Sequence, residues 1–256
     1  MKNILITGAS SGIGQEFAVQ YASPDTRLFL TGRDTDRLEA VARECRSKGS
    51  EVVAACLDVV DRHAMADWID GLVRDFCVDL VIANAGISGG FGGQNIDDIT
   101  RDYKIFDVNL MGVLNTIYPV IPHMVARKSG QIVIISSLAS FIPMPSAPAY
   151  SASKAAVRFY GEALAVKLKP HNIQVTVICP GFIKSRMTDV NDFPMPCLME
   201  TDMAVRYMIG GISRCKARID FPLRLALVLK LVCILPNAFI RWLFAAFPDK
   251  KSLPKD

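Results

Sequence analysis

The sequence predicts an α/β fold: a doubly wound parallel sheet with helices on both faces, followed by apolar C-terminal helices. Three observations support this prediction. Short apolar runs suited to buried parallel strands alternate with longer stretches of helical pattern. A glycine-rich turn follows the first run. Polar residues, glycine or proline follow the later runs, and because parallel strands end at one edge of a sheet, these residues are expected to surround a ligand there.

The predicted strands are short and dominated by aliphatic residues, which suits strands buried on both faces. They are Ile4–Thr7, Leu28–Thr31, Val52–Leu57, Leu80–Ala83, Ile132–Ser136 and Val175–Cys179. The predicted helices are Gly12–Tyr21, Asp34–Lys48, Asp61–Phe76, Asp97–His123 and Ala149–Lys169. Asp34 and Asp61 stand at helix starts, where an aspartate side chain accepts hydrogen bonds from free backbone N–H groups.

The composition is that of a globular protein. The chain has 256 residues, 51% of them hydrophobic, which excludes a disordered or fibrous protein. No Ser/Pro/Gly-rich linker divides it, so one domain is expected. The first predicted strand begins almost at Met1, which leaves no room for a signal peptide and predicts cytoplasmic residence. The seven cysteines form no Cys-x-x-Cys pair, so reduced thiols and no metal site are expected.

The glycine-rich turn lies between the first predicted strand and the first predicted helix. It reads Gly8-Ala9-Ser10-Ser11-Gly12-Ile13-Gly14. Glycine permits a tight turn and lets backbone N–H groups approach a pyrophosphate at the start of the helix. Its position between a strand and a helix gives this pattern meaning. The spacing Gly-x-x-x-Gly-x-Gly differs from the commoner Gly-x-Gly-x-x-Gly of dinucleotide-binding folds.

A tyrosine and a lysine indicate the chemistry. Tyr150 and Lys154 share one face of a predicted helix, because residues four apart are neighbours there. An ammonium beside a phenol favours the phenolate, so we expect the pKa of Tyr150 to be lowered toward working pH. Such a phenol gives a proton to a carbonyl oxygen or takes one from an alcohol. The hydroxyl of Ser137 is expected to hold the same oxygen, whereas Ser136 should point the other way.

Taken together, these motifs resemble the short-chain dehydrogenase/reductase family, in its compact branch of roughly 250 residues. The motifs that carry the likeness are Thr7-Gly8-x-x-x-Gly12-Ile13-Gly14, Asn84-Ala85-Gly86, Asn109, Ser137, Tyr150-x-x-x-Lys154 and Pro180-Gly181. The likeness covers residues 1 to about 190 and is loose beyond them. It implies a Rossmann-like fold and a catalytic domain over residues 1–220, with residues 221–256 as an apolar, basic extension of the same domain.

The resemblance also implies roles for individual residues. The catalytic residues would be Tyr150, Lys154, Ser137 and Asn109, with Asn109 holding a water that extends a proton relay from the lysine. The cofactor-binding residues would be Gly8, Ser10, Ser11, Gly12, Ile13, Gly14, Arg33, Asp58, Asn84, Ala85, Gly86, Tyr150, Lys154, Pro180, Gly181, Ile183 and Ser185. For Asn109 a satisfied core amide is the alternative, and for Asn84 the alternative is a structural role in which its amide ties strands together.

Arg33 indicates the cofactor. It follows the second predicted strand, where the adenosine ribose is expected, and Gly32 takes the position at which NAD-preferring relatives carry Asp. A guanidinium binds a phosphate through two parallel hydrogen bonds, so the resemblance implies NADP(H) rather than NAD(H). A surface arginine is the alternative. Asp58 either accepts from the adenine amino group or serves a turn.

The C-terminal stretch 221–247 departs from the family. It is apolar on nearly every side and is interrupted by three basic residues. A membrane-spanning helix needs about 20 mostly apolar residues, and Lys230 and Pro236 divide this stretch. Two short helices are therefore predicted, the second capped by Asn237.

Charge suggests two interpretations of this stretch, and both remain open. From Arg214 to the C-terminus there are nine Lys and Arg against three Asp and Glu, so this part carries +6 and the remainder −2 of the overall +4. Basic residues beside apolar helices suit an anionic membrane surface. Alternatively, the helices close the substrate pocket or bury against another subunit. Nucleic-acid binding is not expected, because the basic residues alternate with aliphatic ones rather than with a stacking platform.

The expected function is hydride transfer between NADP(H) and a small-molecule carbonyl or alcohol. The residues between Ser137 and Tyr150, 141–145 in particular, are expected to line an apolar pocket, which favours a hydrophobic or lipid-like substrate. The resemblance also implies a homodimer or homotetramer joined through the helices that carry Asn109 and Tyr150. The alternative is a catalytically quiet nucleotide-sensing or membrane-associated scaffold, and a sugar-nucleotide epimerase is disfavoured by the glycine spacing.

Overall fold

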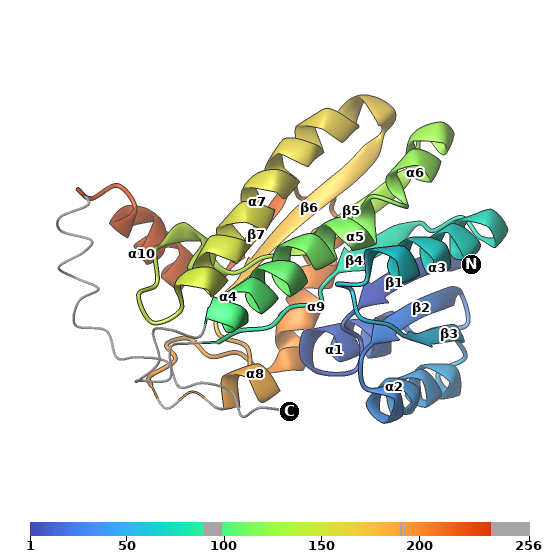
Figure 1. The fold of residues 1–256 in the computed structure, drawn as a ribbon, viewed down its shortest axis with the longest axis horizontal. Helices are drawn as coiled ribbons and strands as arrows, with labels where there is room; N and C mark the ends of the chain where they lie inside the picture. Colours follow the sequence, from blue (N-terminus) through green and yellow to red (C-terminus); the bar gives the residue numbers. More distant parts are fainter. Residues whose placement is uncertain (90–98, 190, 192, 237–256) are drawn as a thin grey trace.

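A computed structural model describes residues 1–89, 99–189, 191 and 193–236. Its centre is a seven-stranded parallel sheet in the order β3-β2-β1-β4-β5-β6-β7 (Figure 1). The strands are β1 Lys2–Thr7, β2 Thr26–Gly32, β3 Glu51–Cys56, β4 Leu80–Ala83, β5 Gly130–Ile135, β6 Ile173–Pro180 and β7 Arg218–Phe221. All six predicted strands are present, and the predicted doubly wound parallel sheet is confirmed. The strand order reverses between β1 and β4, which is where such sheets bind ligands.

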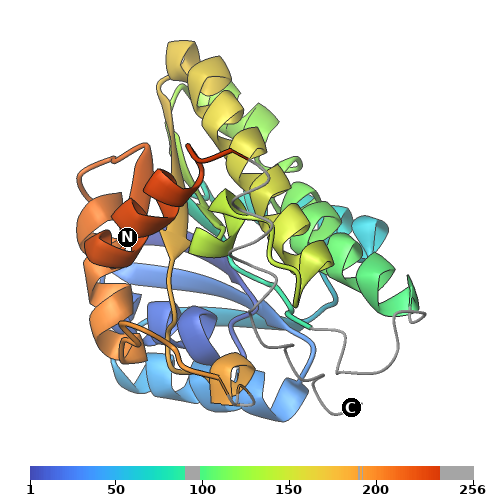
Figure 2. The same cartoon turned by 90° about the vertical axis from the view of Figure 1, so that its left-hand side faces the viewer.

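Helices cover both faces of the sheet (Figures 1 and 2). One face carries α1 Gly12–Tyr21, α2 Thr35–Ser47 and α9 Thr201–Ile212, whose apolar residues form one core cluster with the strands. A second cluster on the other face includes residues of α3 Arg62–Asp75, α5 Gly112–Ile117, α6 Ile121–Arg127 and α7 Pro148–Leu168. The remaining described helices are α4 Ile99–Phe106, α8 Arg186–Asp189 and α10 Leu223–Val232, with short turns η1 Asp107–Met111, η2 Leu138–Phe141 and η3 Lys169–His171.

Two helix starts form as their sequences predict. Asp34 Oδ1 accepts from the backbone N–H of Arg37 at 2.9 Å, and Asp61 Oδ1 accepts from that of Ala64 at 2.9 Å. Each aspartate thereby satisfies a donor that the first turn leaves without a partner. Both predicted N-caps are confirmed, and they direct α2 and α3 away from the carboxyl edge of the sheet.

The predicted helix Asp97–His123 is described only from Ile99 onward, and it is not continuous. The π-turn η1 interrupts it, with the N–H of Gly112 bonded to the carbonyl of Asp107. Pro119, which lacks an N–H, lies in the turn before α6. The whole run Ile99–Arg127 has the length and apolar character of a membrane span, but half of its most apolar window is buried inside the protein. A core helix of a globular domain accounts for these properties.

The C-terminal part contains a strand that the sequence does not predict. In β7, the buried residues Ile219 and Phe221 alternate along the strand with the charged residues Arg218 and Asp220. The strand pairs with β6 at the edge of the sheet. The proposed division between residues 220 and 221 therefore falls inside a strand. The first predicted C-terminal helix is α10, whereas the second helix and its cap Asn237 lie outside the described residues.

Candidate active site

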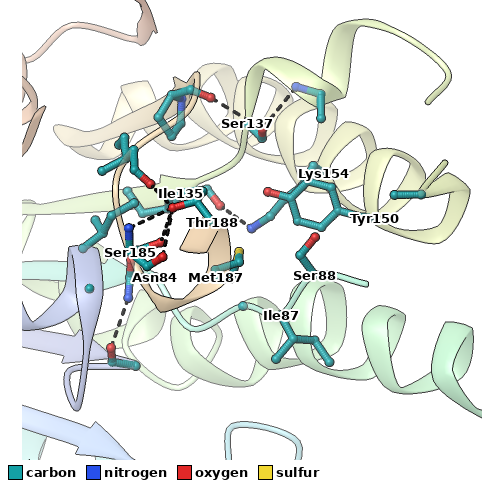
Figure 3. A pocket seen from close by; sticks show the side chains of 18 of the residues that line it. Asn84, Ile87, Ser88, Ile135, Ser137, Tyr150, Lys154, Ser185, Met187 and Thr188 are labelled. Carbon is teal, nitrogen blue, oxygen red and sulfur yellow. Dashed lines mark hydrogen bonds between the residues drawn. The ribbon is translucent and has the colours of Figure 1, made fainter. Parts of the chain in front are cut away.

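A cavity of about 2040 Å³ opens at the carboxyl edge of the sheet (Figure 3). Of the site residues predicted from the sequence, all line this cavity except Gly14 and Asn109. They come from segments far apart in the chain, and the parallel sheet brings them together because its strands end at the same edge.

The glycine turn after β1 has a backbone shape that requires glycine. Gly8 and Gly12 have φ angles of +67° and +56°, in the left-handed region. A Cβ on Gly14 would lie 2.2 Å from the carbonyl oxygen of Gly8, so α1 approaches the turn as closely as a backbone allows. The open backbone at the N-terminus of α1 fits the pyrophosphate of a dinucleotide.

Asn84 ties this turn to β4. Its Nδ2 donates to the carbonyls of Thr7 at 3.0 Å and Gly8 at 3.3 Å. In return, the backbone N–H groups of Asn84 and Ala85 donate to Thr7 Oγ1, each at 3.2 Å. The amide of Asn84 therefore has a structural role, which is one of the two interpretations that the sequence left open.

Arg33 and Asp58 lie side by side at the end of the cavity formed by β2 and β3. Their closest charged atoms are 3.9 Å apart, and both side chains are about half exposed, at 54% and 43%. A surface ion pair of this kind contributes little to stability, so Arg33 is free to bind a ligand. A Cβ on Gly32 would lie 2.9 Å from Ser10 Oγ, so the turn packs directly against this position.

Arg37 is a second arginine in the cavity wall beside Arg33, and it was not among the residues predicted from the sequence. It forms an ion pair with Asp34 at 2.5 Å, and its Nε is buried without a hydrogen-bond partner among the described residues. The hydrogen bond from the backbone N–H of Arg37 lowers the pKa of Asp34, and the ion pair adds to that effect. An arginine one turn into the helix after the second strand is the sequence signal that identifies it.

Tyr150, Lys154 and Ser137 meet in the middle of the cavity (Figure 3). Lys154 is buried, with its Nζ 5.9 Å from the centre of the Tyr150 ring and 3.0 Å from the carbonyl oxygen of Ile135, to which it donates. Ser137 Oγ accepts from the N–H of Ala139 at 3.1 Å. As predicted, Ser136 points the other way, and its Oγ donates to the carbonyl of Lys154 at 2.8 Å.

The pKa of Tyr150 is not lowered, and this corrects the prediction from the sequence. Burial raises the pKa of the Tyr150 phenol, and a hydrogen bond with Ser137 offsets part of the rise. Burial also lowers the pKa of Lys154 to about 8. The reason is that both groups lie in the interior, where the neutral form is favoured. The neutral phenol is the form that donates a proton.

Asn109 lies in the π-turn η1 and is completely buried. Its Oδ1 accepts from the N–H of Ile87 at 2.8 Å, and its Nδ2 donates to the carbonyl of Ile87 at 2.9 Å and to Ser153 Oγ at 3.0 Å. The side chain is therefore a satisfied core amide, which is the alternative interpretation from the sequence. A Cβ on Gly86 would lie 3.2 Å from both Asn109 Oδ1 and Lys154 Nζ.

The segment after β6 forms the opposite wall. The N–H of Gly181 donates to the carbonyl of Phe221 at 2.8 Å, which joins the end of β6 to β7. Ile183 is buried, and the N–H of Ser185 is bonded to Thr188 Oγ1 at 2.8 Å. Ser185 approaches the glycine turn, since a Cβ on Gly12 would lie 3.6 Å from Ser185 Cβ.

The rest of the cavity is largely apolar. Of the residues 141–145 predicted to line it, only Ile142 and Met144 do so. The side chain of Phe141 instead faces the guanidinium of Arg158, at 4.5 Å. Four lining residues, which the sequence did not indicate, are Ser88, Phe182, Met187 and Phe193. Four more belong to α10, whose closing of the pocket was one of the alternatives left open, and they are Leu225, Val228, Leu229 and Val232. The spacing of the last four along α10 is a helical signal.

All seven cysteines are free thiols. Within residues 1–89, 99–189, 191 and 193–236, no group of three or more His, Cys, Asp and Glu side chains is arranged to hold a metal ion.

The fold and the site define an oxidoreductase of the dinucleotide-binding class, and comparisons with known proteins agree. The family model for short chain dehydrogenases matches residues 2–193. An uncharacterized oxidoreductase of Myxococcus xanthus is 40% identical over 237 residues, which are 92% of this chain and 93% of that protein. The 11-beta-hydroxysteroid dehydrogenase-like 2 protein of Arabidopsis thaliana is 40% identical over 190 residues, 73% of this chain but 61% of that protein.

Among solved structures, a short-chain dehydrogenase from Sphingobium yanoikuyae in complex with NADPH has a TM-score of 0.78 and 28% identity, with 99% of each chain covered. This chain belongs to the short-chain dehydrogenase/reductase family. It is therefore an enzyme that acts on a CH–OH or C=O group.

Proposed function

We propose that this protein is an NADPH-dependent reductase of bulky, apolar ketones or aldehydes. The observation that carries the proposal is the convergence of Tyr150, Ser137 and Lys154 in a largely apolar cavity. A protonated phenol at this position can donate its proton to a carbonyl oxygen.

The reaction assigns one task to each side chain. When bound, the nicotinamide nucleotide would supply the hydride. Tyr150 donates its proton to the carbonyl oxygen, and Ser137 donates a hydrogen bond to the same oxygen as negative charge develops there. Lys154 would hold the nicotinamide ribose, and its ammonium supplies positive charge near the phenol. Because the side chain of Asn109 is occupied, its contribution to a proton relay would come from the backbone of the π-turn.

The preference for NADP(H) rests on the two arginines at the adenosine end. Arg33 is half exposed, and Arg37 lies in the same wall of the cavity, so the two guanidinium groups add positive charge where a 2′-phosphate would lie. Gly32 offers no carboxylate to repel it. The nucleotide-binding residues would be those that form the cavity wall around the glycine turn, with Gly181, Ile183 and Ser185 opposite.

The apolar walls support a hydrophobic substrate. Leu225, Val228 and Leu229 of α10 and Phe182 of the facing loop present hydrocarbon to the cavity. The name of the Arabidopsis relative refers to hydroxysteroid substrates, which are bulky and apolar. We therefore place the substrate among ring-containing or long-chain carbonyl compounds.

The experiment follows NADPH oxidation with a panel of apolar ketones and aldehydes. Tyr150→Phe should lower kcat at least about 100-fold, because a general acid contributes that much. Tyr103→Phe, which removes a phenolic hydroxyl from an exposed position on α4, is the matched control and should keep full activity. Turnover of Tyr150→Phe at the wild-type rate would refute the proposed chemistry. NADPH binding without turnover of any carbonyl would instead favour a nucleotide-sensing scaffold.

Cofactor preference is tested separately with Arg33→Ala. This variant should raise KM for NADPH about tenfold or more and leave KM for NADH unchanged, because one charged hydrogen-bonding group is worth about 1.5–3 kcal/mol. Arg43→Ala, on the exposed side of α2, is the control. Equal effects on both nucleotides would contradict the role of Arg33.

Self-association is the last part of the proposal. Apolar residues are exposed along the helices that carry Asn109 and Tyr150, namely Met111, Tyr118 and Phe159. We propose that they form the contacts of a homodimer or homotetramer. A mass measurement in solution that gives a monomer at micromolar concentration would contradict this assembly.

A further inference from the structure

The C-terminal helix α10 has two apolar faces, and only one is used by the cavity. Leu225, Val228, Leu229 and Val232 line the cavity. Ala226 is buried against Leu138, Val177 and Cys179 in a small core cluster. The helix therefore forms part of the wall of the candidate active site, at the end of the molecule that faces the viewer in Figure 2.

The opposite side of the helix is exposed. We define the outer face of α10 as Leu223, Leu227 and Leu231, together with Ile234 in the turn that follows. These side chains are 64%, 60%, 65% and 80% exposed. Their spacing places them along one stripe of the helix. A continuous aliphatic stripe of this kind is not ordinary protein surface and indicates a contact.

The exposure does not arise from a loosely attached helix. Lys230, on the side of α10, forms an ion pair with Asp220 of β7 at 2.5 Å, and its Nζ also lies 5.5 Å from the centre of the Phe141 ring. Cys233 Sγ donates to the carbonyl of Phe141 at 2.6 Å. These contacts fix the rotation of the helix, so the outer face points away from the protein.

Charge identifies the partner. From Arg214 onward the chain carries nine basic and three acidic residues. A second copy of this chain meeting the outer face would bring the same excess of positive charge, and the two would repel. The sequence after α10 contains further apolar and aromatic residues, Phe239, Ile240, Trp242, Leu243 and Phe244. Aliphatic, aromatic and basic residues together match a lipid surface with anionic headgroups.

We propose that the outer face of α10 docks on an anionic lipid membrane surface, so that the mouth of the cavity lies beside the lipid. Apolar substrates would then reach the cavity from the membrane along the inner face of the same helix. Docking itself is independent of catalysis, whereas the route of the substrate rests on the proposed reductase function.

The test is flotation of the full-length protein with vesicles of phosphatidylcholine containing phosphatidylglycerol, and with phosphatidylcholine alone. The double variant Leu227→Glu/Leu231→Glu should bind the anionic vesicles about 30- to 100-fold more weakly, since two exposed leucines lose their burial in lipid. Val53→Glu is the matched control. It places a single glutamate, as Leu227→Glu alone does, on a 40% exposed valine of β3 at the far edge of the sheet, and should float as the wild type does.

Several results would overturn the proposal. They are a wild-type protein that does not float, two variants that float equally, or equal binding to neutral and anionic vesicles. A change in oligomeric mass of the double variant, with no flotation of the wild type, would assign the outer face to a second copy. Should the double variant have a lowered Tm, the single variant Leu227→Glu and the lipid comparison with wild-type protein decide the question.

Membrane docking and the reductase function can be refuted independently of each other. Reduction of a water-soluble carbonyl by the double variant should equal that of the wild type, because Leu227 and Leu231 do not line the cavity. Flotation without any carbonyl reduction would keep the docking surface and refute the reductase. Reduction without flotation would do the reverse.

Discussion

Replacing Lys154 by methionine should remove a pH dependence from the stability of this protein. The lysine is 5% exposed, and burial lowers its pKa from 10.5 to about 8. Between these two values the folded lysine is neutral while the unfolded one still binds a proton. The unfolded state therefore binds more protons, and the free energy of unfolding rises with pH in that window. From pH 7 to pH 9.5 the rise due to this group is about 2 kcal/mol.

Urea denaturation at the two pH values measures this effect. Other ionisable groups titrate in both proteins, so the change in stability of the wild type minus that of Lys154→Met isolates the lysine. Lys167→Met alters an exposed lysine of the same helix and should keep the full rise. A Lys154→Met protein whose stability rises as steeply as that of the wild type would show that burial does not depress this pKa, and the argument for a neutral Tyr150 would lose its support.

Three further changes probe the framework of the site by urea denaturation. Gly14→Ala should lower the free energy of unfolding by about 3 kcal/mol or more, because its Cβ would lie 2.2 Å from a backbone carbonyl oxygen. Gly71→Ala, whose Cβ would have nothing within 4 Å, should raise it by about 0.5–1 kcal/mol. Equal effects of the two substitutions would contradict the close approach at Gly14. Asp61→Ala should lose about 1 kcal/mol through its N-cap, and a loss no larger than that of Asp70→Ala in the same helix would argue against capping. Asn109→Leu should cost about 3 kcal/mol or more by leaving buried partners unsatisfied, and a neutral effect would reopen its role as a water ligand.

Local sequence predicted most of the sheet, because its buried strands are almost purely aliphatic. The N-caps at Asp34 and Asp61 were also predictable, since a cap depends on residues within one turn. Strand β7 was not, because Arg218 and Asp220 alternate with its two buried residues and only pairing with β6 makes the segment a strand. The π-turn at Asn109 leaves no mark on hydrophobic periodicity.

The candidate site shows a similar division. The residues that gather around the cavity were predictable from motif spacing, but the pKa of Tyr150 was not. Sequence proximity places Lys154 on the same helix face, whereas only the structure shows its ammonium turned to the carbonyl of Ile135 and both groups withdrawn from water. The sequence left open whether the C-terminal helices close the cavity. In the structure, four residues of α10 line it.

The contact between Gly32 and Ser10 makes a switch of cofactor a problem of two positions. An aspartate at 32 would have to place its Cβ 2.9 Å from Ser10 Oγ and 3.0 Å from Ser10 Cβ. Rotating the hydroxyl relieves the first clash and leaves the second. An aspartate at position 32 of this chain would therefore require Ser10 to shift, and a smaller residue at position 10 would ease a change of cofactor toward NAD.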